Sequence, residues 1–328
     1  MGLSEINLKD LSRYEDLISR ITEYGASVRE SVFNALPDEL MTAFERVREI
    51  YMQGVLRGKG RVDSASIINE YLNVPRIEEL LRYLLLTTVL FTGFRRLMNE
   101  KVYGVLLRNY QDIKPLLTDP SYKVIGDLSA RLVHDYGGSE DDVQEVYNAL
   151  HGFVYGIRKL TGAYKTTLVK WLPRFTDVGE LEESLQIFYP PRANERRRRA
   201  IRTFIRWVSH ESNLPVALGL ILRGRYRSYM PIVDIYSSMV TIRSGAFLAL
   251  GSERVGKLLH KILTNRERAV VRIDEVKGIV RSTARLSSDP ILFERGAFRI
   301  GHDYCVKLKC DECPLNRYCM KITWVVMK

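Results

Sequence analysis

No cysteine precedes Cys305 in this chain of 328 residues, and all four cysteines lie between Cys305 and Cys319. Secreted proteins that depend on disulfides distribute their cysteines along the chain, where they join distant elements. The distribution here therefore excludes such a disulfide framework. A local group of four cysteines in an intracellular chain instead indicates a metal site.

The sequence also lacks a long apolar run. The longest mostly apolar segment, residues 83–91, is interrupted by Thr87 and Thr88 and is far shorter than the roughly 20 residues needed to cross a bilayer. Residues 1–17 have mixed charge and do not show the basic and then apolar segments of a secretory signal. With 46% hydrophobic and 27% charged residues and a mean hydropathy of -0.14, we expect a globular cytoplasmic protein with no membrane partner.

Alternating strand patterns bounded by hairpin turns are missing as well, so no sheet is predicted. Apolar residues instead recur at spacings of three and four, which is typical of helices that bury one face. We therefore predict an all-α fold. The expected helices cover residues 38–58, 63–72, 77–98, 122–134, 141–158, 194–210, 235–250, 253–263 and 274–286.

Segments rich in glycine, proline or charge separate these helices at residues 57–61, 135–141, 189–194 and 223–231. None is long enough to be a disordered linker, and no repeat of fixed period is present. The prediction is a linear division into three parts: an N-terminal helical region, a second helical region that contains the basic stretch, and a region that contains the cysteines. Their predicted bounds are 1–138, 139–286 and 287–328.

Positive charge is concentrated in one part of the chain. The sequence has 50 Lys and Arg against 39 Asp and Glu, a net charge of +11. Residues 192–227 contain ten arginines and no lysine, opposed by only Glu195 and Glu211. This excess predicts a polyanionic partner, although runs of charge are also typical of solvated faces.

Arginine favours bidentate contacts with phosphate, and tyrosines beside it offer stacking surfaces for bases. The sequence therefore predicts nucleic-acid-binding residues in the basic stretch. The candidates are Arg196, Arg197, Arg199, Arg202, Arg223, Arg225, Arg227, Tyr226 and Tyr229.

The four cysteines, Cys305, Cys310, Cys313 and Cys319, are separated by four, two and five residues. Four thiolates in so short a segment can hold one tetrahedral zinc ion or one [4Fe-4S] cluster. Zinc ribbons usually contain two C-x-x-C pairs, whereas only Cys310 and Cys313 form such a pair here. The spacing therefore favours the cluster, with zinc as the alternative.

This pattern, with Pro314-Leu315 after the third cysteine, resembles the cluster loop that ends many DNA glycosylases of the endonuclease III type. The first gap has four residues where those enzymes commonly have six. The resemblance implies a [4Fe-4S] cluster that shapes a basic loop against DNA. The charge of this loop would come from Lys307, Lys309, Arg317 and Lys321.

A loop with glycine, then Pro231, Asp234 and a long helix is similar to the helix-hairpin-helix, Gly/Pro and Asp arrangement of the DNA glycosylase superfamily. The likeness is greatest to a sparsely characterised branch, through Arg206-Trp207, Asp289-Pro290 and residues 296–301. It covers about residues 140–321 and implies a glycosylase-like helical domain over 139–286. The implied function is DNA repair, in which a damaged or mismatched base is flipped from duplex DNA and removed.

In that superfamily the aspartate matched by Asp234 stabilises the positive charge that develops on deoxyribose as the base leaves. Read by itself, Asp234 is a typical helix N-cap, and the two roles are compatible. Bifunctional members also use a lysine just upstream, which forms a Schiff base. No lysine lies between Trp171 and Gly256, so we expect a monofunctional enzyme, with Lys165 or Lys257 as the remaining lyase candidates.

Two departures from the superfamily bear on activity. The Leu-Pro-Gly-Val-Gly turn is absent, and Tyr236 stands where many relatives have histidine. A non-catalytic iron-sulfur protein that binds DNA therefore remains an alternative on the same fold. A zinc-stabilised RNA-binding protein is a third interpretation. His302-Asp303, just ahead of the cysteines, is interpreted as structural.

Overall fold

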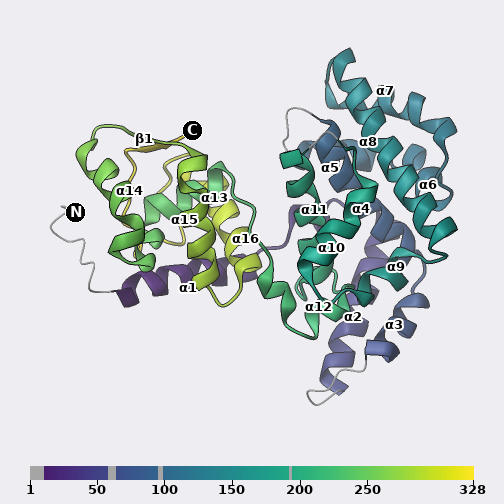
Figure 1. Ribbon diagram of the computed structural model, residues 1–328, viewed down its shortest axis with the longest axis horizontal. Coiled ribbons are helices and arrows are strands. Elements are labelled where there is room, and N and C mark those ends of the chain that lie inside the picture. Colours follow the sequence, from purple (N-terminus) through teal and green to yellow (C-terminus); the bar gives the residue numbers. More distant parts are fainter. Residues whose placement is uncertain (1–10, 58–63, 95–98, 192–193) are drawn as a thin grey trace. The chain divides into compact units, whose positions relative to one another are not determined.

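The computed structural model describes residues 11–57, 64–94, 99–191 and 194–328, and helices make up most of it (Figure 1). The basic Gly-rich segment at 57–61 lies almost wholly outside the described residues. No helix in the described ranges is long and apolar enough to span a bilayer.

The chain forms two compact units, which we call the central unit and the terminal unit. The central unit is residues 30–228, and the terminal unit combines residues 1–29 with residues 229–328. The predicted linear division differs from this one. Its first boundary, at 138, falls inside the central unit, and its second, at 286, falls inside the terminal unit. The two ends of the chain share one unit, which a linear reading of the sequence does not show.

The described residues of the central unit form helices joined by turns and loops, and none of them is in a strand. Its elements are η2 (Ser31–Asn34), α2 (Asp38–Arg57), α3 (Ser64–Leu72), α4 (Ile77–Gly93), α5 (Asn99–Arg108), α6 (Tyr110–Thr118), η3 (Tyr122–Val124), α7 (Ile125–Tyr136), α8 (Glu140–Arg158), η4 (Lys159–Ala163), α9 (Leu168–Trp171), η5 (Leu172–Arg174), α10 (Val178–Ser184), η6 (Leu185–Phe188), α11 (Asn194–Ser209), α12 (Leu218–Ile221) and η7 (Arg225–Ser228). Nearly every residue of α4 is buried, because α2, α8 and α11 pack around it. The helix predicted to begin at residue 77 is thus the buried centre of this unit.

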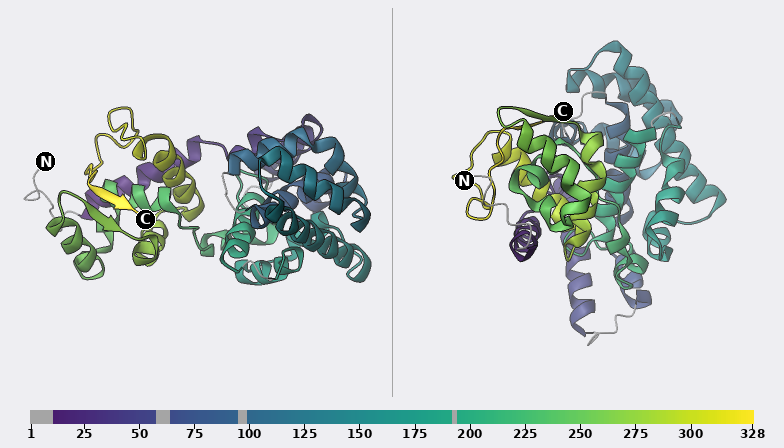
Figure 2. Two further views of the ribbon diagram at one scale, coloured as in Figure 1. Left: turned by 90° about the horizontal axis from the view of Figure 1, so that it is seen from above. Right: turned by 60° about the vertical axis from the view of Figure 1, so that its left-hand side comes forward.

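The terminal unit contains five longer helices and a small sheet. Its elements are α1 (Leu11–Ser27), α13 (Ile235–Ser244), η8 (Ala246–Leu250), α14 (Ser252–Thr264), β1 (Ala269–Val271), α15 (Ile273–Leu286), α16 (Pro290–Ile300), η9 (Gly301–Cys305) and β2 (Val325–Met327). Figure 2 shows the last part of the chain, in yellow, running from α16 through the cysteine loop, residues 305–319, to β2.

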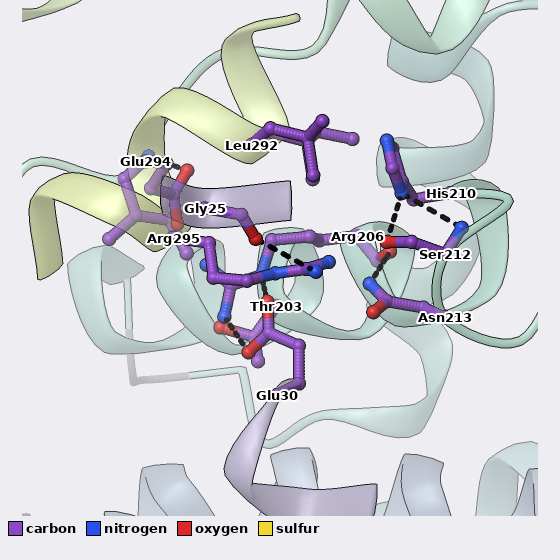
Figure 3. A network of polar contacts seen from close by, with 12 residues as sticks. Gly25, Glu30, Thr203, Arg206, His210, Ser212, Asn213, Leu292, Glu294 and Arg295 are labelled. Atoms are coloured by element: carbon purple, nitrogen blue, oxygen red, sulfur yellow. Dashed lines mark hydrogen bonds and ion pairs between the residues drawn. The ribbon is translucent and has the colours of Figure 1, made fainter. Parts of the chain in front are cut away.

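Helix α1 joins the rest of the terminal unit by packing against α16. A Cβ atom on Gly25 would overlap the carbonyl oxygen of Leu292, and one on Gly296 would overlap that of Ile21. The two glycines therefore let the helix backbones touch directly. Nη1 of Arg295 adds hydrogen bonds to the carbonyl oxygens of Gly25, at 3.3 Å, and Val28, at 3.1 Å; the bond to Gly25 is drawn in Figure 3.

Strands β1 and β2 pair in parallel, with Ala269 opposite Val325 and Val271 opposite Met327. This sheet differs from the prediction of no strands. Each strand has three residues, too few for an alternating pattern to be read. Their pairing is also long-range, since helices α15 and α16 and the cysteine loop lie between them in sequence.

The predicted helices over 38–58, 63–72, 141–158, 194–210, 253–263 and 274–286 are confirmed within one or two residues. The helix expected over 235–250 is instead divided at Gly245, whose φ of 90° is left-handed. The segment 122–134 starts as the short turn η3 before α7 begins. The helix expected to reach residue 98 ends at Gly93, and residues 95–98 lie outside the described part.

Candidate functional site

Asp234 is the N-cap of α13, which confirms that part of its interpretation. Its Oδ1 accepts hydrogen bonds from the backbone N of Ser237, at 2.7 Å, and from the hydroxyl of Ser237, at 2.9 Å. The backbone N of Asp234 donates in return to Ser237 Oγ at 3.0 Å. This reciprocal box fixes the half-buried carboxylate at the start of the helix.

The turn that presents Asp234 is anchored by two other helices. The backbone N of Ile232 donates to the carboxylate of Glu294 on α16 at 2.8 Å. Nε of Arg281 on α15 donates to the carbonyl oxygen of Pro231 at 3.4 Å. The position of Asp234 is thus determined by contacts on both sides of the turn, within the terminal unit.

An aromatic group follows Asp234 on the first turn of α13. The ring of Tyr236 meets those of Phe298 and His302 edge-on, with centroids 5.3 and 5.4 Å apart. Phe298 and His302 stack at 6.1 Å, and Nδ1 of His302 lies 2.8 Å from Oδ1 of Asp303. The pair His302-Asp303, interpreted from the sequence as structural, thus contacts the first turn of α13. The spacing of four residues between Phe298 and His302 indicates only that these two rings lie on one side of the chain.

The four cysteines are half-buried, and Cys305, Cys313 and Cys319 pack against the hydrophobic cluster formed mainly by α1 and α16. Burial raises the pKa of the Cys305 thiol to about 12 and that of Cys319 to about 11, and it raises the pKa of Cys313 as well. The neighbouring cysteines, Cys313 first among them, raise the pKa of the Cys305 thiol further.

No three His, Cys, Asp or Glu side chains are placed to hold a metal ion within the ranges that the structure describes. The chemistry of the donor set nevertheless fits a thiolate-bound group. All four sulfurs belong to one short loop, residues 305–319. A thiol binds metal as the thiolate, and a bound cation favours that form against the cost of burial.

Helix α13 ends against the cysteine loop. Nη1 of Arg243 donates to the carbonyl oxygen of Cys305 at 2.8 Å, and its Nε and Nη2 donate to that of Val325 at 3.0 and 2.8 Å. The carbonyl of Ser244 accepts from the backbone N of Met320 at 3.0 Å. One helix of ten residues therefore has Asp234 at its start and the cysteine loop at its end.

The arginine run lies on α11 in the central unit. Arg196 and Arg199 are exposed, and Nε of Arg199 lies 3.6 Å from Oε1 of Glu195. Nη1 of Arg197 donates to the carbonyl oxygen of Pro191 at 3.2 Å. This end of the helix presents cationic groups to solvent.

Further along α11 the arginines face the protein. Nε of Arg202 lies 3.1 Å from Oε2 of Glu182 on α10, and both side chains are largely buried. This pairing contradicts the prediction that Arg202 is available to phosphate. Arg206 pairs in the same way with Glu30, Nε to Oε1 at 2.9 Å (Figure 3). Trp207 is fully buried among aromatic rings, so the Arg-Trp motif belongs to the core.

The second part of the basic stretch is mixed. Arg223 and Arg225 are exposed on either side of Gly224. The side chains of Tyr226 and Arg227 lie outside the described part of the structure. Tyr229 is fully buried, so the prediction that its ring stacks on a base is wrong.

The two lysines considered for a lyase reaction lie in different units. Lys165 is exposed in the central unit. Lys257, in the terminal unit with Asp234, lines an open cavity between α14 and α15 together with Lys261 and Glu275. Nζ of Lys261 contacts the Glu275 carboxylate at 2.7 Å.

Comparison of the chain with protein-family models, curated proteins and solved structures finds no match. A function for this chain therefore has to be argued from its own side chains.

Proposed function

We propose that this chain is a DNA-repair protein of the base-excision N-glycosylase type, which removes a damaged or mismatched base flipped from duplex DNA. The observation that supports the proposal best is helix α13, which begins at Asp234 and ends against the cysteine loop. The two features that resemble the glycosylases are therefore in contact with one helix of one compact unit.

Asp234 supplies the catalytic carboxylate in this proposal. As the bond between the sugar and the base breaks, its electron pair leaves with the base and positive charge develops on deoxyribose. A carboxylate held by Ser237 stabilises that charge without having to reorient. It also orients and accepts a proton from the water whose oxygen bonds to the sugar carbon. Because no lysine precedes Asp234 nearby in sequence, the reaction stops at base removal.

Cys305, Cys310, Cys313 and Cys319 are the proposed ligands of a [4Fe-4S] cluster, with zinc as the alternative. When bound, such a group cross-links the loop that carries it. Arg243 then connects this loop to α13 through the carbonyl oxygen of Cys305. The proposed duplex-binding residues are the outward arginines of the central unit, among them Arg196, Arg199, Arg223 and Arg225.

Substitution Asp234→Asn tests the catalytic role. Asparagine is as good an N-cap as aspartate, so the helix should be retained while the charge is lost. We expect base release to fall at least about 100-fold, the scale seen when a group that stabilises transition-state charge is removed. The assay scores alkali-dependent strand breaks in duplexes that carry uracil, oxidised guanine, alkylated bases or mismatches.

The matched control is Asp289→Asn. Asp289 caps α16 in the same unit, where it accepts hydrogen bonds from the backbone N of Ile291 and Leu292. This substitution should leave base release unchanged. Strand breaks without alkali would indicate a lysine nucleophile and contradict the monofunctional reaction. If the wild-type protein binds duplex DNA but releases no base from any of these substrates, the non-catalytic DNA-binding alternative holds.

Iron and sulfide analysis of protein purified without oxygen tests the cofactor. About four iron and four sulfide per chain are expected for a [4Fe-4S] cluster. One zinc and no iron would establish the alternative and would contradict the cluster.

A further inference from the structure

A surface apart from Asp234 and from the arginine run lies along α8 in the central unit. His151 and Tyr155 are exposed one helical turn apart on α8, and Arg158 and Lys159 follow after another turn. Tyr122 in η3 and Tyr164, which follows η4, complete this surface, which we call the α8 patch. It consists of Tyr122, His151, Tyr155, Arg158, Lys159 and Tyr164.

The aromatic rings of the α8 patch face solvent to an unusual degree. Tyr155 is 49% exposed, Tyr164 is 53% exposed and Tyr122 is 38% exposed. Rings of this size generally bury most of their surface in a core or an interface. None of these three tyrosines contributes a buried side chain to the core.

Ring and cation contacts join members of the patch in two groups, one around Tyr122 and one around Tyr164. The rings of Tyr122 and His151 lie 4.8 Å apart, and the guanidinium carbon of Arg158 is 5.7 Å from the centre of the Tyr122 ring. Nζ of Lys159 is 5.9 Å from the centre of the Tyr164 ring. Cations and rings are thus arranged side by side, and each ring keeps exposed surface.

From residue 146 to residue 176 the charged side chains all have one sign. Residues 146–176 contain no aspartate or glutamate, and their five Lys and Arg are Arg158, Lys159, Lys165, Lys170 and Arg174. The π-helical turn η4 lies in the middle of this segment and carries Gly162. A Cβ atom built on Gly162 would meet no atom within 4 Å, so the surface there is open to a ligand.

We propose that the α8 patch binds single-stranded nucleic acid, with bases stacked on Tyr155 and Tyr164 and phosphates bound by Arg158 and Lys159. Exposed rings beside cations, in a segment without acidic residues, are the groups that such binding uses. In an intact duplex the faces of the bases are stacked on one another and cannot reach the rings. This activity requires neither Asp234 nor the cysteine loop.

The test uses the full-length protein and fluorescently labelled single strands of about 15 nucleotides, in the range of known site sizes. Tyr155→Ala with Tyr164→Ala should weaken binding of the single strand at least about tenfold, because base stacking is lost. Tyr155→Phe with Tyr164→Phe should bind as the wild type does, since the rings remain. Thermal unfolding verifies that all variants are folded.

A charge control separates stacking from general attraction. Arg158→Gln with Lys159→Gln should weaken single-strand binding and reduce its dependence on salt. Arg46→Gln with Arg48→Gln removes the same charge from α2 and should have a clearly smaller effect. Parallel DNA and RNA strands identify which nucleic acid binds more tightly.

The proposal is overturned if the double alanine variant binds single strands as tightly as the wild type. It is also overturned if the α2 control weakens binding as much as the Arg158 and Lys159 variant, or if both nucleic acids fail to bind. Asp234→Asn should bind single strands normally, so failure of the glycosylase proposal and failure of this one give different results.

Discussion

At the scale of single residues, Gly245 lets the segment that follows the cysteine loop pack closely against the end of α13. Its backbone has φ 90° and ψ 2°, and a Cβ atom there would overlap the side chain of Met320, which follows Cys319. A side chain at this position would therefore be strained twice, by the left-handed backbone and by the contact.

We predict that Gly245→Ala lowers the free energy of unfolding of the terminal unit by about 2–5 kcal/mol, the sum of the cost of a left-handed backbone and of overpacking. Gly137→Ala is the matched control. Gly137 is also left-handed, with φ 74°, but its Cβ would only touch the end of Lys101 at 3.7 Å. This control should cost about 1 kcal/mol. Urea unfolding measures both, and equal losses would refute the role of Met320.

The environments of the candidate site residues were predictable from the sequence to different degrees. The N-cap role of Asp234 follows from its position after Pro231, since capping is a local property. The burial of Tyr229 and the pairing of Arg202 with Glu182 depend on tertiary contacts. A sequence of alternating arginines and tyrosines has no local feature that distinguishes a buried ring from an exposed one.

At the scale of elements, the amphipathic helices were predicted well because each buries one face on a regular spacing, as α2 and α15 do. The pairing of β1 with β2 was not predictable, since two strands of three residues leave no periodic signal. Helix α1 was also missed. Its apolar face packs against α16, which lies near the other end of the chain, so the neighbouring sequence does not show what this face contacts.

Arg243 connects three elements: α13, η9 and β2. We predict that Arg243→Met lowers the free energy of unfolding by about 2–3 kcal/mol, because the carbonyl oxygens of Cys305 and Val325 lose their charged donors. The loss should be local to the C-terminal segment. Hydrogen exchange of the backbone amides of Ala269 and Lys328, which bond across the small sheet, should accelerate.

The control for this element is Arg272→Met. Arg272 is largely exposed and lies 3.4 Å from Glu275, and surface ion pairs of this kind contribute at most about 1 kcal/mol. If the two substitutions cost the same, or if the sheet amides exchange at the wild-type rate in Arg243→Met, Arg243 does not hold β2 in place.

At the scale of the whole molecule, the terminal unit is built from the two ends of the chain. Leu17, Ile18 and Ile21 of α1 belong to the same hydrophobic cluster against which Cys305, Cys313 and Cys319 pack. The environment of the cysteines thus depends on a segment nearly three hundred positions earlier. Because this unit combines both ends of the chain, a division of the sequence into consecutive segments does not reproduce it.

We predict that Gly296→Leu, which blocks the approach of α1 to α16, prevents binding of the proposed [4Fe-4S] cluster or zinc although it changes no cysteine. A side chain on Gly296 would overlap the carbonyl oxygen of Ile21, so α1 cannot pack against α16. The hydrophobic cluster beside the cysteines then loses its residues from α1. Gly278→Leu is the matched control in the same unit, because a Cβ atom on Gly278 meets nothing within 4 Å. Metal content and sulfide per chain are measured for both, and thermal unfolding verifies that both variants are folded. Full metal content in Gly296→Leu would show that the cysteine loop forms without α1, and that the two ends of the chain are joined for stability alone.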